Sequence, residues 1–282
     1  MLKKIKSWAE RNNYRFDQRR KLMRYENDFK EYVTQLRNGS DKRLETSDIL
    51  RFGDHFVESK EYFTHYDAFA KYAFEEVWKF NKTSDKTPRI FDVGSTKAFL
   101  SILSVFCEVE ALNLNDPLDY HTSVKYTKGD ISEYNPRLNP KAGSYDFITS
   151  FASFHLLGLG RYGDKINPAA QSKFVELCDT LLAPGGKVIF SFSFGKDQLL
   201  FNNGWVFSLE TIKNFFSNFK IIDVLVDRNS YGTLNFDQDP GKRFIRLNCE
   251  GENINYHYRD FKTEKIPYDI AFIVLEKSFL NK

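Results

Sequence analysis

The sequence predicts a doubly wound α/β fold, in which helices cover both faces of a seven-stranded, mostly parallel sheet. From Arg89 onward, short apolar runs alternate with segments of helical periodicity, as repeated strand–helix–strand units do. The first run ends in a glycine turn at Gly94, and a later helical segment is stopped by Pro184-Gly185-Gly186 directly before another apolar run. Both breaks are typical of parallel sheets with crossover helices.

Seven strands are expected, at residues 89–94, 109–114, 124–130, 145–150, 187–193, 219–226 and 268–275. Helices are expected at 97–106, 170–182 and 208–216. No internal repeat or low-complexity tract interrupts the alternation. Residues 86–282 are therefore predicted to form one domain.

Residues 1–85 are predicted to form a helical lid or extension ahead of the sheet. A charged stretch over 1–43 and an aromatic-rich stretch over 47–80 both have helical spacing, and 82–88 is a polar loop that ends in proline. Most rings of the aromatic stretch are expected to pack in the core. Covering a bound ligand and burying a homodimer face are the alternatives.

The composition indicates a globular, cytoplasmic protein. Of 282 residues, 41% are hydrophobic and 28% charged, and the net charge of +3 comes without a basic stripe, which argues against nucleic-acid binding. Cys107, Cys178 and Cys249 are widely separated, so neither a metal site nor a disulfide framework is expected. No apolar run approaches the roughly 18 residues of a membrane span, and no apolar signal segment follows the basic start, so no membrane insertion is expected.

The end of the first strand carries the first candidate binding residues, Asp92, Gly94 and Ser95. Glycine lets the backbone turn and approach a ligand closely. Open α/β sheets bind ligands beyond the carboxyl ends of their strands, where the strand order reverses. The segment lacks the GxGxxG pattern, and an ordinary strand-to-helix turn is the alternative.

Polar residues at the next strand ends extend this set. About 20 residues beyond the glycine turn, dinucleotide-type folds place an acidic residue on ribose hydroxyls. Asn113 stands there, and Asp116 takes this role if the strand ends later. Asp130 can accept from the amine of adenine while Ile131 packs on the ring, or it can simply cap the next element. Ser150, at the end of the fourth strand, completes the set.

A helix stopped by Pro-Gly-Gly and followed by a buried strand, as in residues 182–190, is the most diagnostic stretch. Together with the strand ends it resembles the class I S-adenosyl-L-methionine (SAM)-dependent methyltransferases, whose members commonly read Leu-x-Pro-Gly-Gly here. Residues 219–226 and the last strand resemble that family's antiparallel terminal hairpin. The resemblance covers about residues 89–276 and implies a Rossmann-like methyltransferase fold with SAM as cofactor.

A narrower resemblance lies after the fourth strand. Residues 158–164 read Gly-Leu-Gly-Arg-Tyr-Gly-Asp, similar to an uncharacterised methyltransferase-like family with this signature, often preceded by Glu-His. His155 is retained here, and Phe154 stands in place of the Glu. Residues 202–205 and 63–66 resemble other segments of that family. Its members tend to accompany surface-polysaccharide (capsule) genes, which implies a glycan or glycan-precursor substrate.

Two histidines are candidates for catalysis. Methyl transfer from a sulfonium is an in-line displacement that depends on positioning, and a hydroxyl acceptor also needs a base with a pKa near the working pH. His155, just past the fourth strand, is the first candidate. His65 is the second, if the aromatic helix folds over the cofactor. A structural role is the alternative for each.

The glycine-rich loop supplies the candidate substrate-binding residues. Arg161 can hold a phosphate or carboxylate by a forked contact, unless it only pairs with Asp164 to fix the loop. Tyr162 is expected to pack rather than react, and Asn202 lies in the matching segment further on. The glycines favour a loop of special backbone shape; they are Gly158, Gly160 and Gly163.

The sequence therefore predicts a SAM-dependent methyltransferase acting on a small molecule or surface-polysaccharide precursor, by O-methylation of a hydroxyl or phosphate-type group. An NAD-dependent oxidoreductase is one alternative, opposed by the missing GxGxxG pattern and the antiparallel-looking last strand. A catalytically inactive SAM-fold binding protein is another, supported by Asn113 and Phe154. No metal is expected, and homodimer formation is left open.

Overall fold

The computed structural model describes residues 19–20, 23, 26–27, 30, 34, 64–115, 123–201, 203–228, 243–248, 256 and 268–278. The chain divides into two compact units, Met1–Tyr62 and Phe63–Lys282. The few described residues of the first unit are helical, and the rest of the helix predicted over 1–43 lies outside the described residues. Helix α2 (His65–Thr83) belongs to the same compact unit as the sheet. The predicted division into 1–85 and 86–282 stays a prediction.

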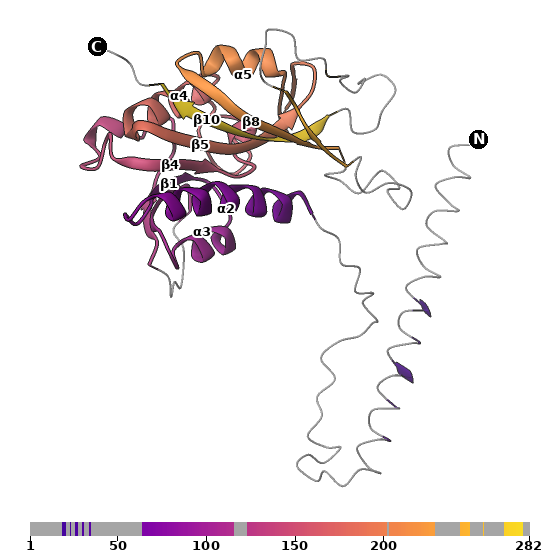
Figure 1. The fold of residues 1–282 in the computed structure, drawn as a ribbon. Coiled ribbons are helices and arrows are strands. Elements are labelled where there is room, and N and C mark those ends of the chain that lie inside the picture. Colours follow the sequence, from indigo (N-terminus) through magenta and orange to yellow (C-terminus); the bar gives the residue numbers. More distant parts are fainter. Residues whose placement is uncertain are drawn as a thin grey trace. The chain divides into compact units, whose positions relative to one another are not determined.

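The sheet confirms the predicted doubly wound α/β fold (Figure 1). The strands that match the prediction are β1 (Arg89–Val93), β2 (Glu108–Asn113), β3 (Lys125–Lys128), β4 (Tyr145–Ser150), β5 (Leu182–Phe194), β8 (Phe219–Asp227) and β10 (Asp269–Lys277). They lie in the order β3-β2-β1-β4-β5-β10-β8. The first five pair in parallel, and β10 runs antiparallel between β5 and β8. The strand order reverses between β1 and β4, where such sheets bind ligands.

Three short strands were not predicted and bring the sheet to ten strands within the described residues. They are β6 (Gln198–Leu200), β7 (Gly204–Phe207) and β9 (Phe244–Arg246). Each has only three or four residues, too few for alternation of apolar and polar residues to identify a strand. Strand β7 pairs in parallel with the end of β5, so it lies beside the edge of the sheet where the parallel strands end.

From the sequence, Pro184-Gly185-Gly186 is expected to break the chain between a helix and a strand, whereas in the structure the segment lies within β5. Tyr145 pairs with Leu182 while Phe147, two residues on, pairs with Lys187, so the extra residues of β5 form a bulge against β4. Gly185 has φ +75°, and a Cβ on Gly186 would lie 3.0 Å from the Tyr145 carbonyl oxygen. The glycines therefore permit close backbone pairing rather than a chain reversal.

Helices cover both faces of the sheet, with α2 and α3 (Lys97–Leu103) on one and α4 (Ala170–Leu181) and α5 (Leu209–Phe215) on the other (Figure 1). Two short 3-10 helices, η2 (Pro136–Leu138) and η3 (Phe154–Leu156), lie in the connections. Each face has its own apolar core: Phe174 and Ile212 belong to one, Phe69 and Leu100 to the other. Apolar residues on opposite faces of one buried sheet require this double covering.

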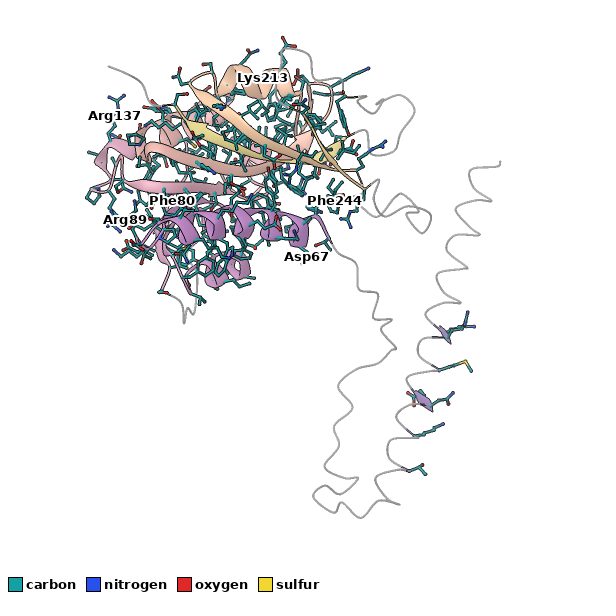
Figure 2. The ribbon with its side chains drawn as sticks, viewed as in Figure 1. Asp67, Phe80, Arg89, Arg137, Lys213 and Phe244 are labelled. Atoms are coloured by element: carbon teal, nitrogen blue, oxygen red, sulfur yellow. The ribbon has the colours of Figure 1, made fainter. Side chains whose placement is uncertain are left out.

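The described aromatic side chains of α2 mostly pack into the core, as predicted. Phe69 stacks on Phe151 with ring centroids 4.4 Å apart. Phe80, which Figure 2 labels on α2, meets Phe147 edge to face at 5.4 Å. Tyr66 and Trp78 are the exceptions, 46% and 54% exposed. No helix among the described residues has the length and apolar character that a membrane span requires.

A capping box starts α2 at a defined residue. The Thr64 backbone N–H donates to Asp67 Oδ2 at 2.8 Å, and the Asp67 N–H donates to Thr64 Oγ1 at 3.3 Å. Such reciprocal bonds satisfy N–H groups that the first helical turn leaves without partners. They hold His65 and Tyr66 in the first turn of α2.

Candidate functional site

A cavity of about 270 Å³ lies where β1, β2 and β3 end, and we call it the strand-end cavity. Four of the predicted cofactor-binding residues line it: Gly94, Asn113, Asp130 and Ile131. The first three strand ends therefore converge on one cavity, and the prediction that these residues bind a cofactor stays a prediction. A larger, open hollow of about 1090 Å³ lies over α5, β8 and β9, away from these strand ends, and has none of the candidate residues in its lining.

Gly94 is required by the geometry at the end of β1. Its φ is +76°, and an added Cβ would lie 2.7 Å from Ser153 Oγ. The Ser153 hydroxyl donates to the Gly94 carbonyl at 2.8 Å, which ties the loop after β4 to the end of β1. Only glycine allows this close approach with a left-handed backbone.

Asp92, Ser95 and Ser150 were predicted to bind the cofactor, but they do not line the cavity. The buried Asp92 carboxylate accepts bonds from the Ser95 N–H at 2.9 Å, the Ser95 hydroxyl at 2.5 Å and the Thr149 hydroxyl at 2.6 Å. The Ser150 hydroxyl donates to the Val93 carbonyl at 3.0 Å. These bonds join the ends of β1 and β4. The three side chains therefore fix the backbone next to the cavity and do not line it.

Asp92 should make stability depend on pH. Burial raises the pKa of this carboxyl to about 6, against the lowering effect of the bonds from Ser95 and Thr149. Because the folded protein binds this proton more tightly, the raised pKa adds to the free energy of unfolding. The addition is complete below the unfolded pKa near 3.8 and is lost as the pH rises through about 6. An asparagine stays neutral, so we expect the unfolding free energy of Asp92→Asn relative to wild type to be higher at pH 7 than at pH 4, by on the order of 2 kcal/mol. Urea denaturation between these pH values measures the difference.

The matched control for this prediction is Asp85→Asn, which changes an exposed carboxyl outside the sheet. As an exposed surface substitution, it should change the unfolding free energy by no more than about 0.5 kcal/mol. A pH-independent difference for Asp92→Asn as well would show that Asp92 does not titrate differently in the folded and unfolded states.

Asp130 lines the strand-end cavity and also holds two backbone segments. Its Oδ1 accepts from the Ser132 N–H at 2.8 Å, and its Oδ2 accepts from the Lys165 N–H at 2.7 Å. The carboxylate therefore caps the turn after β3, the alternative role considered from the sequence, and fixes the end of the glycine-rich loop. Each oxygen retains a second acceptor position. The predicted contact with adenine stays a prediction.

Asn113 lines the cavity from the end of β2. Its Oδ1 accepts from the Asn115 N–H at 3.3 Å. Asp116, the alternative ribose contact, lies outside the described residues. A side-chain amide therefore stands at the position where a ribose hydroxyl is expected.

A second cavity, of about 260 Å³, adjoins the first, and we call it the histidine cavity. The residues that it shares with the strand-end cavity are Tyr66, Ala152, Leu156 and Tyr162. Both predicted catalytic histidines line it, His65 from α2 and His155 from η3, together with Arg161. The two cavities thus meet at one wall, with the proposed catalytic groups on one side of it.

Ala152, in this shared wall, has a strained backbone with φ +53°, the only positive φ outside glycine within the described residues. Its N–H donates to Ser191 Oγ at 2.9 Å, so the end of β5 holds it in place. Strained residues that the surrounding structure holds in place tend to cluster at functional sites. This strain is consistent with a site at the junction of the cavities.

His155 is buried, and its Nδ1 has no hydrogen-bond partner within the described part of the chain. Burial lowers the pKa of His155 to about 4, with further lowering from His65 and Arg161. The imidazole is therefore neutral at neutral pH. Gly204 packs against it: a Cβ there would lie 2.7 Å from His155 Cδ2.

The glycine-rich loop has the special backbone shape that the sequence predicts. The φ values are +75° at Gly158, +72° at Gly160 and +90° at Gly163. Asp164 accepts from the backbone N–H groups of Gly160 at 3.1 Å and Tyr162 at 3.2 Å. Asp164 therefore fixes the loop through its backbone, and Asp164 and Tyr162 also line the strand-end cavity.

Arg161 is positioned by a residue that the sequence did not single out. Its Nη1 donates to Asn203 Oδ1 at 2.7 Å, and Asn203 Nδ2 donates to the Tyr268 hydroxyl at 3.4 Å. The predicted substrate-binding residue Asn202 lies outside the described residues, whereas its neighbour Asn203 lines the histidine cavity. The resemblance of residues 202–205 to the narrower family was the only sequence signal for this position.

Phe154, the departure from the narrower family's pattern, is buried in the apolar core. Its ring contacts Phe174, Phe190 and Phe207 at centroid distances of 5.4, 4.9 and 5.5 Å. It lines neither cavity. The phenylalanine that replaces the family's Glu therefore contributes no group to the lining of either cavity.

The fold and the site define a doubly wound α/β protein with adjoining cavities where its strand order reverses. Residues 101–238 match the model of a family described as "Caenorhabditis protein of unknown function, DUF268". No curated protein matches.

Solved structures similar to the chain include the following three, all at low identity. TehB from Haemophilus influenzae is 15% identical, with 75% of this chain and 66% of TehB covered and a TM-score of 0.43. The 1,6-didemethyltoxoflavin-N1-methyltransferase of Burkholderia thailandensis is 12% identical, with 79% of this chain and 94% of that enzyme covered and a TM-score of 0.44. The N-methyltransferase NodS of Bradyrhizobium japonicum WM9 is 12% identical, with 74% of this chain and 87% of NodS covered and a TM-score of 0.43. A fold hosts many functions, so the function is argued from the site.

Proposed function

We propose that the chain is a SAM-dependent methyltransferase, with SAM in the strand-end cavity and a small-molecule acceptor in the histidine cavity. The observation that carries the proposal is the convergence of Gly94, Asn113 and Asp130 on one cavity that shares a wall with a second, histidine-lined one. Ligand sites of open α/β sheets lie at this position. Two adjoining cavities suit a reaction between two bound molecules.

The lining of the strand-end cavity fits the parts of SAM. The backbone of Gly94 is exposed and lines the cavity, and it can approach the amino-acid end of SAM closely because glycine carries no side chain of its own. The Asn113 amide can bond ribose hydroxyls, a role for which Asp116 is the alternative. Asp130 supplies an acceptor for the adenine amine, and Ile131 an apolar surface for the ring. Bound there, SAM supplies a methyl group to a nucleophilic oxygen and leaves as S-adenosylhomocysteine (SAH).

His155, which lines the histidine cavity, is the proposed base for a hydroxyl acceptor, and His65 is the second candidate. The imidazole of His155 is neutral and can accept the hydroxyl proton, but its pKa of about 4 lies below the value expected of the base from the sequence, so it is a weaker base than an ordinary histidine. Tyr66, Leu156 and Tyr162 form the side-chain part of the shared wall and would help to exclude water from the reacting atoms. Arg161 is proposed to hold the acceptor. O-methylation of a hydroxyl or phosphate-type group, a surface-polysaccharide precursor as acceptor, and a cytoplasmic location are parts of the same proposal.

Isothermal titration with SAM, SAH and NAD tests the proposal. We expect SAH to bind at one site per chain with a dissociation constant in the order of micromolar, and Asn113→Ala to weaken it about tenfold. Lys213→Ala, on α5 beside the open hollow, should bind SAH as wild type does. Failure of both SAM and SAH to bind would rule the proposal out, and NAD binding in their place would favour the oxidoreductase.

Turnover is tested separately with methyl-labelled SAM and a panel of hydroxyl-bearing small molecules. Label transfer to at least one of them is expected. SAH binding without transfer to any acceptor would favour the catalytically inactive binding protein.

A further inference from the structure

We infer that the histidine cavity selects a small acceptor that carries both a negative charge and a hydroxyl group, with the anionic group on Arg161 and the hydroxyl on His155. The inference rests on the proposed function and narrows its substrate class. It comes from three features of the cavity: the placement of Arg161, the presence of His155 in the lining, and the wall shared with the strand-end cavity.

Arg161 is held in place before any ligand arrives. The Asn203 side chain accepts a hydrogen bond from the Arg161 guanidinium and donates one to the Tyr268 hydroxyl. Asn203, just before β7, and Tyr268, just before β10, therefore orient the guanidinium. Arginine presents several N–H donors in a rigid planar fork that matches carboxylate and phosphate oxygens. An arginine fixed in this way loses little conformational freedom when an anion binds.

The lining of the histidine cavity favours an anion over a cation. Among its described residues none is a carboxylate, and Arg161 carries the permanent charge. This charge also acts on His155, since it contributes, after burial and His65, to lowering the pKa of His155. A protonated amine would be repelled by the same charge, so the cavity disfavours cationic acceptors and N-methylation of them.

A hydroxyl is the group that suits His155. His155 lines the histidine cavity, and its Nδ1 is fully buried, so Nε2 is the ring nitrogen that a ligand can reach. In one tautomer Nε2 is a donor and in the other an acceptor, and a hydroxyl can meet either, because it both donates and accepts. His155 precedes Leu156 of the shared wall, which places this hydroxyl near the strand-end cavity.

The proposed methyl transfer takes place between the acceptor and SAM, with His155 as the base. The O–H bond of the acceptor breaks as its oxygen forms a bond to the methyl carbon. The proton passes to the imidazole of His155, and the S–C electron pair stays on sulfur.

Four hexose probes of similar size test the inference on SAH-saturated protein by isothermal titration: glucose, glucosamine, glucuronate and glucose 1-phosphate. We expect at least one anion to bind about tenfold or more tighter than glucose, and glucosamine to bind more weakly than glucose. A preference for glucuronate alone indicates a carboxylate acceptor, and one for glucose 1-phosphate alone a phosphate ester. Equal binding of all four probes, or binding of none, would overturn the inference.

Arg161 variants locate the preference. Arg161→Gln should remove the advantage of the anion over glucose, and Arg161→Lys should keep part of it. SAH affinity should be unchanged in both, because Arg161 does not line the strand-end cavity, and this also reports that the variants fold. Lys213→Gln on α5 is the charge-matched control and should keep the full preference. An anion preference that survives Arg161→Gln contradicts the inference.

Nuclear magnetic resonance of the imidazole of His155, assigned with His155→Gln, adds a readout that a merely structural arginine would not give. Its signal should shift when the preferred anion is added, and this shift should be lost in Arg161→Gln. If SAH does not bind but the anion preference and its dependence on Arg161 persist, the proposed function fails while the anion site stands. If SAH binds and no preference is seen, only the anion site fails.

Discussion

Replacing Gly94 by alanine is expected to weaken SAH binding strongly and to destabilise the fold, although it adds only a single methyl group. Alanine at φ +76° is strained, and its Cβ would lie 2.7 Å from Ser153 Oγ. The end of β1 and the loop after β4 must then separate, which alters the wall of the strand-end cavity. We expect SAH affinity to fall at least about tenfold and unfolding free energy to fall by about 2 kcal/mol. Isothermal titration and urea denaturation measure the two effects.

Gly143→Ala is the matched control for this prediction. Gly143 has φ +73°, nearly that of Gly94, but a Cβ there meets nothing within 4 Å. It should lose about 1 kcal/mol of stability from backbone strain alone and bind SAH as wild type does. Adding Ser153→Gly to Gly94→Ala removes the clashing side chain and should restore part of the affinity. Wild-type SAH binding by Gly94→Ala would contradict the cavity assignment.

Replacing His155 by glutamine is expected to lower kcat by about a hundredfold or more, with the acceptor that gives the fastest label transfer. Glutamine keeps hydrogen-bonding capacity in similar space but cannot take the proton. SAH affinity should be unchanged, because His155 does not line the strand-end cavity. Steady-state kinetics combined with SAH titration separates the loss of the base from a loss of binding.

The pH dependence of kcat/KM should follow the protonation of His155. The neutral imidazole is the competent form, and its pKa is lowered to about 4, so kcat/KM should fall only as pH drops towards 4. An ordinary histidine would lose activity already through about pH 6.5. His65→Gln is the control: a larger loss there than in His155→Gln would make His65 the base. Loss of kcat/KM through pH 6.5 would contradict the buried, neutral state of His155.

The positions of the strands and helices were largely predictable, because their signals are local. The strand at 145–150 matches β4, and Pro184-Gly185-Gly186 marked a real irregularity. Whether that irregularity is a turn or a bulge depends on pairing with β4, which lies some forty residues earlier in the chain. The short strands β6, β7 and β9 carry too few residues for a periodic pattern.

The candidate site was predictable where topology alone decides proximity. Gly94, Asn113 and Asp130 each end a parallel strand, and the carboxyl ends of parallel strands meet at one edge of a sheet. The same reasoning placed Asp92, Ser95 and Ser150 there, but their side chains are buried. Asp92 accepts a hydrogen bond from the Ser95 N–H, and the Ser150 hydroxyl donates to the backbone at the end of β1. Proximity follows from strand order, whereas side-chain direction follows from the detailed packing around each turn.

By itself, the sequence determined the doubly wound fold, the strand ends that form the first cavity and the special shape of the glycine-rich loop, because each depends on patterns within a few residues or on strand order. Only the tertiary structure decided that Asn203 and Tyr268 would orient Arg161, and that His155 would be buried beside Gly204. Those contacts join segments far apart in the chain. Their geometry arises from how β5, β7 and β10 lie side by side, which no local pattern records.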